Sequence, residues 1–297
     1  FIEYGVQKTK YYLVNNLVVF FAPVLASAVW GARGLNRFLR GVFLGGLALT
    51  AYFWLSKSYL DLPFNIYAVL NFNPIELSRL IGLFILLAVF GRMMPFPSPV
   101  MFSLAAAAGA AMVLLNARGP ALALVIALLF WGAGAVRRKF RLLPLLAVPM
   151  FLLLAAYISS NYWFSPGFFS MEDTGRLQLY QAALASLAQN PALGAGTGSY
   201  AYFSPVPEIY YPHNLFLESA VELGFPGLAL SLLLVFAPLS RLMFGKKRVK
   251  DAAMAGALLT FCFINAMISG DIPGNFLLWL SAGVTASLAM VSAEDIQ

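Results

Sequence analysis

The chain has 297 residues, of which 61% are hydrophobic and 10% are charged. A soluble globular domain has roughly 45–50% apolar and about 25% charged residues, so this composition excludes a water-soluble protein. Long apolar runs recur along the sequence, and each approaches the roughly 20 residues that an α-helix needs to cross a bilayer. The runs do not alternate polar and apolar residues as the strands of outer-membrane barrels do. We therefore expect an all-α polytopic membrane protein.

Candidate membrane spans follow one another in the sequence. The nine spans lie at residues 11–30, 41–56, 75–91, 99–115, 121–135, 143–159, 214–240, 252–269 and 274–291. The segment from Asp61 to Pro74 contains proline and asparagine among apolar residues, which fits a partly inserted loop better than a span. We expect a single transmembrane domain over residues 1–297, with one long outer loop at residues 160–213.

Basic residues divide the loops into two sets. Cytoplasmic loops of membrane proteins are enriched in Lys and Arg. Placing the loops at 31–40, 92–98, 136–142 and 241–251 inside collects 13 of the 19 basic residues. The opposite set then holds nine of the twelve acidic residues, the only histidine, and Lys8, Lys10, Lys57, Arg79, Arg118 and Arg176. The basic clusters are thus topology signals, and we expect no nucleic-acid binding.

This orientation places residue 1 outside, and the chain begins with Phe1 instead of methionine. An odd number of further spans ahead of Phe1 would restore a cytoplasmic N-terminus. We therefore expect additional N-terminal helices in a longer protein.

The long outer loop contains a helical pattern. Residues 172–174 (Glu-Asp-Thr) precede apolar residues at spacings of three and four, and Asn190 and Pro191 end the pattern. The apolar positions are Leu177, Tyr180, Leu184 and Leu187. The pattern predicts an amphipathic helix on or near the outer membrane surface. The glycine-rich residues 194–198 follow a helix and not a strand, so they indicate a turn and not a nucleotide-binding loop.

Two arginines on the outer side are candidate anion ligands. Arg176 lies in the first turn of the predicted helix, where it either pairs with Glu172 or Asp173 or binds an anion together with the free amides. Arg118 stands between two apolar runs, where an arginine costs about 2.5–3.5 kcal/mol if it is central in the bilayer. It either snorkels to the interface or supplies a second anion contact, because its donor fork matches phosphate oxygens.

His213 is the only histidine and lies where the long outer loop meets the next span. It is either a structural hydrogen-bonding residue or a base, since an unperturbed pKa near 6.5 allows it to take a proton from a hydroxyl at neutral pH. Downstream, Asn214, Glu218 and Glu222 share one helix face at i, i+4 and i+8. Two carboxylates so spaced repel each other, and we expect at least one to be protonated or paired with an arginine.

Three segments resemble the O-antigen ligase and polymerase superfamily, whose members are membrane glycosyltransferases that use undecaprenyl-diphosphate-linked glycans. The most specific is YPHNLFLESAVELGFPGL at residues 211–228. The others are NARGPALAL at residues 116–124, and Gly175-Arg176-Leu177 followed by NPALGAGTG at residues 190–198. The resemblance extends over about residues 99–291. Family members usually have Ser or Thr where this chain has Ala117.

The resemblance implies a periplasmic, inverting transfer that needs no metal and no other cofactor. It assigns Arg118 and Arg176 to the donor diphosphate and His213 to the base. Asn214, Glu218 and Glu222 would support these residues, and Arg79, near the outer end of its span, is the next candidate for the diphosphate.

The possible enzymes of this family differ in the acceptor that they use. A ligase uses a lipid A core sugar, a polymerase uses another lipid-linked glycan, and an oligosaccharyltransferase uses a protein. A transporter or flippase of lipid-linked sugars is an alternative of a different class. Transporters of this kind are expected to show internal repeats and broken helices near the midplane, and the sequence gives no sign of either.

Overall fold

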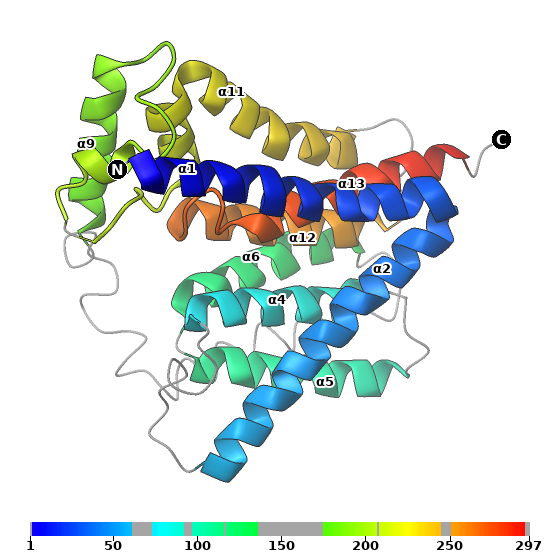
Figure 1. Ribbon diagram of the computed structural model, residues 1–297. Helices are drawn as coiled ribbons and strands as arrows, with labels where there is room; N and C mark the ends of the chain where they lie inside the picture. Colours follow the sequence, from blue (N-terminus) through cyan, green and yellow to red (C-terminus); the bar gives the residue numbers. More distant parts are fainter. Residues whose placement is uncertain are drawn as a thin grey trace.

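The computed structural model describes residues 2–60, 73–91, 97–115, 117–135, 175–206, 208–244 and 251–294. Every regular element in these ranges is helical, which confirms the predicted fold class for them (Figure 1). The elements are α1 (Ile2–Tyr11), the π-helical turn η1 (Tyr12–Asn16), α2 (Leu17–Leu60), α4 (Pro74–Phe90), α5 (Ser98–Leu114), α6 (Arg118–Ala135), α9 (Arg176–Gln189), α10 (Tyr200–Phe203), α11 (Leu215–Phe244), α12 (Ala252–Ile268) and α13 (Phe276–Glu294).

Most predicted spans coincide with helices. The spans predicted at 75–91, 99–115 and 252–269 agree with α4, α5 and α12 to within one residue at each end. Among the described residues, the stretches Glu3–Ser56 and Leu215–Phe244 are long and apolar enough to cross a membrane, and shorter apolar helices accompany them. The predicted span at 143–159 and most of the loop at 61–74 lie outside the described residues.

The predicted loop at residues 31–40 is wrong, because the chain reverses at a single residue. Gly31 has φ 57° and ψ −147°, and residues on both sides of it are helical. Glycine adopts a positive φ without steric cost, so one residue replaces a loop. The exposed side chains of Arg33 and Arg37 therefore lie on helical turns directly after the reversal.

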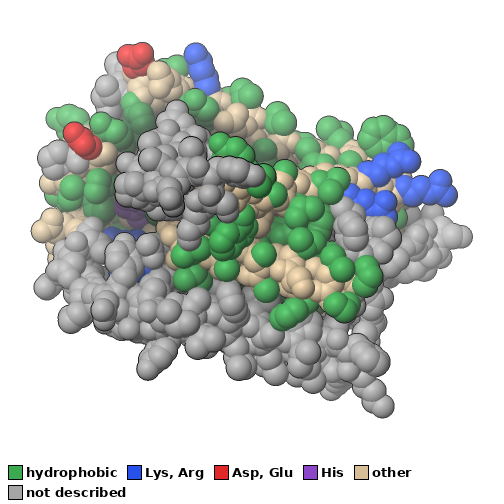
Figure 2. All heavy atoms as spheres, turned by 90° about the horizontal axis from the view of Figure 1, so that it is seen from below, with side chains coloured by type: hydrophobic (Ala, Val, Ile, Leu, Met, Phe, Trp, Pro, Cys, Tyr) green, Lys and Arg blue, Asp and Glu red, His purple; other side chains and the backbone are tan. Residues whose placement is uncertain are grey.

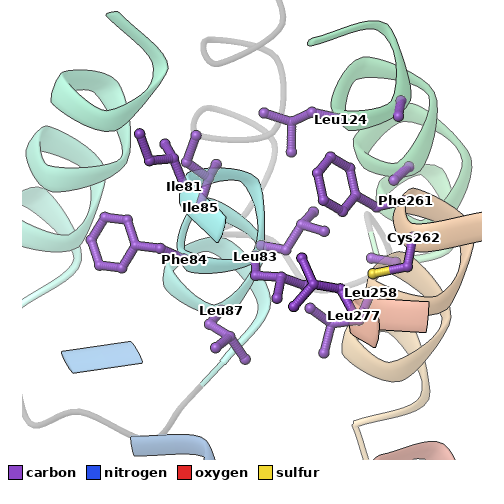
Figure 3. Packing of buried hydrophobic residues seen from close by; sticks show 14 of the residues in the cluster. Ile81, Leu83, Phe84, Ile85, Leu87, Leu124, Leu258, Phe261, Cys262 and Leu277 are labelled. Carbon is purple, nitrogen blue, oxygen red and sulfur yellow. The ribbon is translucent and has the colours of Figure 1, made fainter. Parts of the chain in front are cut away.

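Helix α4 lies at the centre of the bundle, and nearly all of its side chains are buried. Figure 3 shows its apolar side chains meeting those of Leu124 from α6 and Phe261 from α12. On the other side, the ring of Phe84 lies 4.8 Å from that of Phe43 of α2. This packed core holds α4, α6 and α12 in fixed positions relative to one another, and all three contribute residues to the candidate site.

The helix ends fall into the two sets that the basic residues predict. The N-terminus and the starts of α6 and α11 lie at one end of the bundle in Figure 1, and the sharp bend of α2 and the end of α11 lie at the other. In Figure 2, one group of Lys and Arg side chains lies at the end away from the histidine, and other basic side chains lie beside the histidine. The candidate site is therefore built entirely at one end of the molecule.

Candidate active site

Residues of the candidate site bind the C-terminal end of α12. Its last carbonyl groups have no partner within the helix. The guanidinium Nη2 of Arg79 donates to the carbonyl oxygens of Ser269, at 2.7 Å, and Asn265, at 3.3 Å. The amide Nδ2 of Asn214 donates to the carbonyl of Met267 at 3.5 Å. A cation is also favourable at this negative end of the helix dipole, so Arg79 has a structural role here.

Arg118 reaches the same end of the bundle from α6. It is the first residue of α6, so the helix begins three residues before the predicted span. The neighbouring Gly119 lies against α12, since a Cβ atom on it would stand 2.8 Å from Cδ1 of Ile268. Ile268 adjoins Ser269, to which Arg79 donates. The two arginines therefore approach the end of α12 from separate helices.

His213 is held in a turn directly before α11. Its φ of 56° is uncommon for a residue other than glycine. The next residue, Asn214, caps the helix: its Oδ1 accepts the amides of Phe216 and Leu217, each at 3.1 Å. The ring of Tyr211 meets the imidazole edge to face at 4.6 Å between centroids. The His213 Nδ1 atom is buried and has no hydrogen-bond partner among the residues that the structure describes.

The surroundings of His213 keep its imidazole neutral. Burial, followed by the positive charges of Arg176 and Arg79, lowers the pKa of His213 to about 4. The structure thus brings together three of the residues that the sequence singled out, from α4, α9 and the turn before α11. A neutral imidazole can accept a proton, and the nearby cations favour an anion.

Helix α9 begins and ends where the pattern predicts. It begins at Arg176, after Gly175 in a left-handed conformation, and it ends at Gln189. Residues 172–174 lie outside the described part of the chain. On the predicted apolar face, Leu177 and Leu184 are 42% and 55% exposed, whereas Tyr180 and Leu187 pack against a small core.

The buried residues of α9 are Leu179, Ala183 and Ser186. They face a small core that includes Tyr200 and Val221, and the Tyr200 hydroxyl donates to the Leu179 carbonyl at 2.8 Å. The small side chains of Ala183 and Ser186 allow α9 to pack closely against the elements that carry Tyr200 and Val221. The buried face of α9 is therefore set by this packing. The exposed leucines remain available to lipid.

Glu218 and Glu222 are paired with a residue that the sequence did not single out. Lys8 of α1 lies 2.6 Å from Glu218 Oε1 and 2.5 Å from Glu222 Oε1, and all three side chains are almost completely buried. The expected arginine partner is therefore wrong, and the partner is a lysine. Lys8 precedes Glu222 by 214 residues, so no local spacing could have shown the pairing.

Helix α11 is broken at Gly224, a break of which the sequence shows no sign. Gly224 has φ 67° and ψ −161°. The carbonyls of Val221 and Glu222 accept instead the amides of Ala195 and Gly196, at 2.8 and 3.0 Å. The glycine-rich segment is a turn as predicted, and its function here is to complete the backbone pairing of a broken helix. A buried backbone group left unpaired in a membrane would cost several kcal/mol.

Close backbone contact explains the glycines at this junction. A Cβ atom on Gly194, which has φ 73°, would stand 2.5 Å from backbone atoms of Glu222 and Gly224. Any side chain there would separate the turn from α11. The first two turns of α11, from Leu215 to Leu223, consequently form a separate half-helix between His213 and the break.

An apolar cavity of about 580 Å³ opens beside this half-helix, between η1, α2, α11 and α13. Its lining includes Tyr12, Phe20, Leu230 and Trp279, together with Thr197 and Leu215. Leu215 is two residues from His213 in the sequence. The volume and apolar lining of the cavity suit a hydrocarbon chain.

Comparison with known proteins agrees with the motifs. Residues 100–232 match the family model described as O-antigen ligase. The resemblance is thereby confirmed over the segment that holds Arg118, Arg176 and His213, whereas residues 233–291 lie beyond the match. No curated protein and no solved structure matches the chain. The family implies a glycosyltransferase-type enzyme with lipid-linked glycan substrates and, with the apolar helices, indicates a membrane protein.

Proposed function

We propose that the chain is an O-antigen ligase-like glycosyltransferase, which moves a glycan from undecaprenyl diphosphate to a lipid A core sugar at the periplasmic face of the bacterial inner membrane. The observation that carries the proposal is the turn at His213. There a neutral imidazole, whose Nδ1 has no partner in the described part of the chain, lies close to Arg176 and Arg79 in a segment with a family match.

In the proposed reaction, the imidazole of His213 takes the proton of the acceptor hydroxyl as that oxygen attacks the anomeric carbon of the donor sugar. A new carbon–oxygen bond forms on one face of the sugar. The bond to the diphosphate breaks on the other face, and its electron pair leaves with the diphosphate. The product therefore has the inverted configuration, and His213 is left as an imidazolium.

Arg118 and Arg176 are assigned to the diphosphate. Guanidinium forks match phosphate oxygens two at a time, and fixed cations in a site of low dielectric stabilise charge that develops on a leaving group. Arg79 contributes a third positive charge from a fixed position, because its Nη2 is already bound to the α12 carbonyls. The isoprenoid tail is assigned to the apolar cavity whose lining includes Thr197 and Leu215.

The test is transfer in vitro by the purified protein. A defined undecaprenyl-diphosphate glycan is offered with a lipid A core acceptor, with a second lipid-linked glycan, or alone. We expect an inverted product on the lipid A core, with activity that survives EDTA. Chain extension of the lipid-linked glycan would identify a polymerase, and movement of intact donor across vesicles without a product would identify a transporter. Inhibition by EDTA that magnesium or manganese reverses would exclude the metal-independent mechanism.

Orientation is tested by cysteine labelling in a Cys262→Ser background, since Cys262 is the only cysteine and is buried. Leu193, in the outer loop, is 80% exposed. We expect Leu193→Cys to react with a membrane-impermeant reagent applied from the periplasm. Lys247→Cys, at a position outside the described residues, should react only after the membrane is opened. The reverse pattern would place the site on the cytoplasmic side and exclude a periplasmic acceptor.

A further inference from the structure

The half-helix from Leu215 to Leu223 is held at both ends by hydrogen bonds. At its start, the Asn214 side chain reaches the Met267 carbonyl. At its end, the amides of Ala195 and Gly196 bind the carbonyls of Val221 and Glu222. His213 directly precedes this unit, so any rotation of the half-helix moves the imidazole relative to the arginines.

Rotation about the axis of the half-helix is opposed by Lys8. Glu218 and Glu222 lie one turn apart, and the same ammonium group binds both at 2.6 and 2.5 Å. Lys8 is itself held in place, because α1 packs against the glycine-rich turn and the Tyr4 ring contacts that of Tyr210 at 5.4 Å. Two contacts one turn apart define an angle as well as a distance, whereas a single contact would leave the half-helix free to turn.

We propose that Lys8 is a positioning residue for His213, which it holds in place by bridging Glu218 and Glu222 on the half-helix. Lys8 lies in α1, outside the matched segment 100–232, so the family match gives it no role. The expected loss of kcat on removal of the bridge rests on the proposed function, but the expected displacement of the imidazole does not. A lysine that only neutralised buried charge would be dispensable once the two glutamates were neutral.

Replacing Lys8 alone would leave two buried carboxylates without a cation, and removal of one partner of a buried ion pair is strongly destabilising. The informative variant is therefore the triple change Lys8→Met, Glu218→Gln and Glu222→Gln, which removes the bridge without leaving a buried charge. Lys8→Arg keeps a cation that can reach both carboxylates. Lys10→Met is the matched control, because Lys10 is on the same helix but exposed.

The kinetic measurement compares kcat and the donor KM. We expect the triple variant to lose about 10²-fold in kcat with a donor KM near that of the wild type, because a misplacement of about 1 Å can cost that much. Lys8→Arg should restore most of kcat, and Lys10→Met should match the wild type. A folded triple variant with the wild-type kcat would overturn the proposal.

A second measurement needs no activity. His213 is the only histidine, so isotope labelling of histidine gives one imidazole signal in the NMR spectrum. We expect this signal to shift in the triple variant and to stay in place in Lys10→Met. An unmoved signal in the triple variant would overturn the positioning role. If the wild type transfers no glycan, the proposed function fails while this measurement still decides the role of Lys8.

Discussion

Two clusters of charged residues lie next to the half-helix at residues 215–223, and they differ in how their charges are paired. Along the side of the half-helix, two carboxylates bind Lys8, so the positive charge of Lys8 is fully offset. Before its start, Arg79 and Arg176 act on His213, and the bonds of the Arg79 Nη2 go to neutral carbonyls. The first cluster sets one cation against two carboxyl groups and so leaves no positive charge over, whereas the second retains a positive potential.

The difference between the two clusters distinguishes structural charged groups from reactive ones in this molecule. Buried charges are costly unless they are paired, so a paired cation such as Lys8 needs no ligand. Positive potential that persists next to a neutral base is favourable only when an anion is bound. The lipid-linked diphosphate proposed above is such an anion. Each of the following changes alters His213 or the arginines of the candidate site and leaves the Lys8 cluster intact.

The largest effect is expected for His213. His213→Ala removes the proposed base and should lower transfer by about 10²–10⁴-fold, measured as product formed per folded molecule. His213→Asn is the matched variant, because asparagine accepts the left-handed backbone of this turn. Both should fold and insert as the wild type does and both should be inactive. Transfer at the wild-type rate by either variant would remove the base assignment.

A smaller loss is expected at the proposed diphosphate contacts. Arg118→Lys and Arg176→Lys keep the charge but lose the donor fork, and a charged hydrogen bond contributes about 1.5–3 kcal/mol, or roughly 10–100-fold. We expect a weaker donor KM and an unchanged acceptor KM in each. Arg241→Lys, at the far end of α11, is the control. If both variants bind donor as the wild type does, the diphosphate lies elsewhere, with Arg79 the next arginine to replace.

The smallest effect is a shift in pH dependence. His213 must be unprotonated to act as a base, so kcat/KM of the free enzyme should fall only as pH drops through about 4, the lowered pKa of His213, and not near 6.5. Arg176→Gln removes one of the lowering charges and should move this limb to higher pH, whereas Arg241→Gln should not. A wild-type limb near 6.5 would contradict the burial of the imidazole.

The same shift acts on folding. The pKa of His213 is lower in the folded protein than in the unfolded chain. Between about pH 4 and 6.5 the unfolded chain therefore binds more protons at this residue, and its contribution to stability declines as pH falls through that range.

Sequence reasoning identified the elements set by local composition. The spans at α4, α5 and α12 follow from apolar runs whose length the bilayer dictates. The reversal at Gly31 was missed because a single glycine gives no composition signal. The cap at Asn214 was not predicted, because the sequence analysis placed this residue on the helix face of Glu218 and Glu222.

The candidate site was only partly predictable. His213, Arg118 and Arg176 stood out as isolated polar residues in apolar surroundings, and their motifs supplied the rest. The roles of Lys8 and Gly224 depend on contacts between segments that are distant in the chain. Such pairings require the fold, because one sequence contains no record of which helices become neighbours.

Lys8 also sets a limit on engineering. The segment that matches the family contains both glutamates but not the lysine that neutralises them. A graft of residues 100–232 onto another helical scaffold would bury two carboxylates without a counter-ion unless the host supplied a cation at the corresponding place. The portable unit for chimaeras with related enzymes is therefore a discontinuous one, made of the matched segment together with α1.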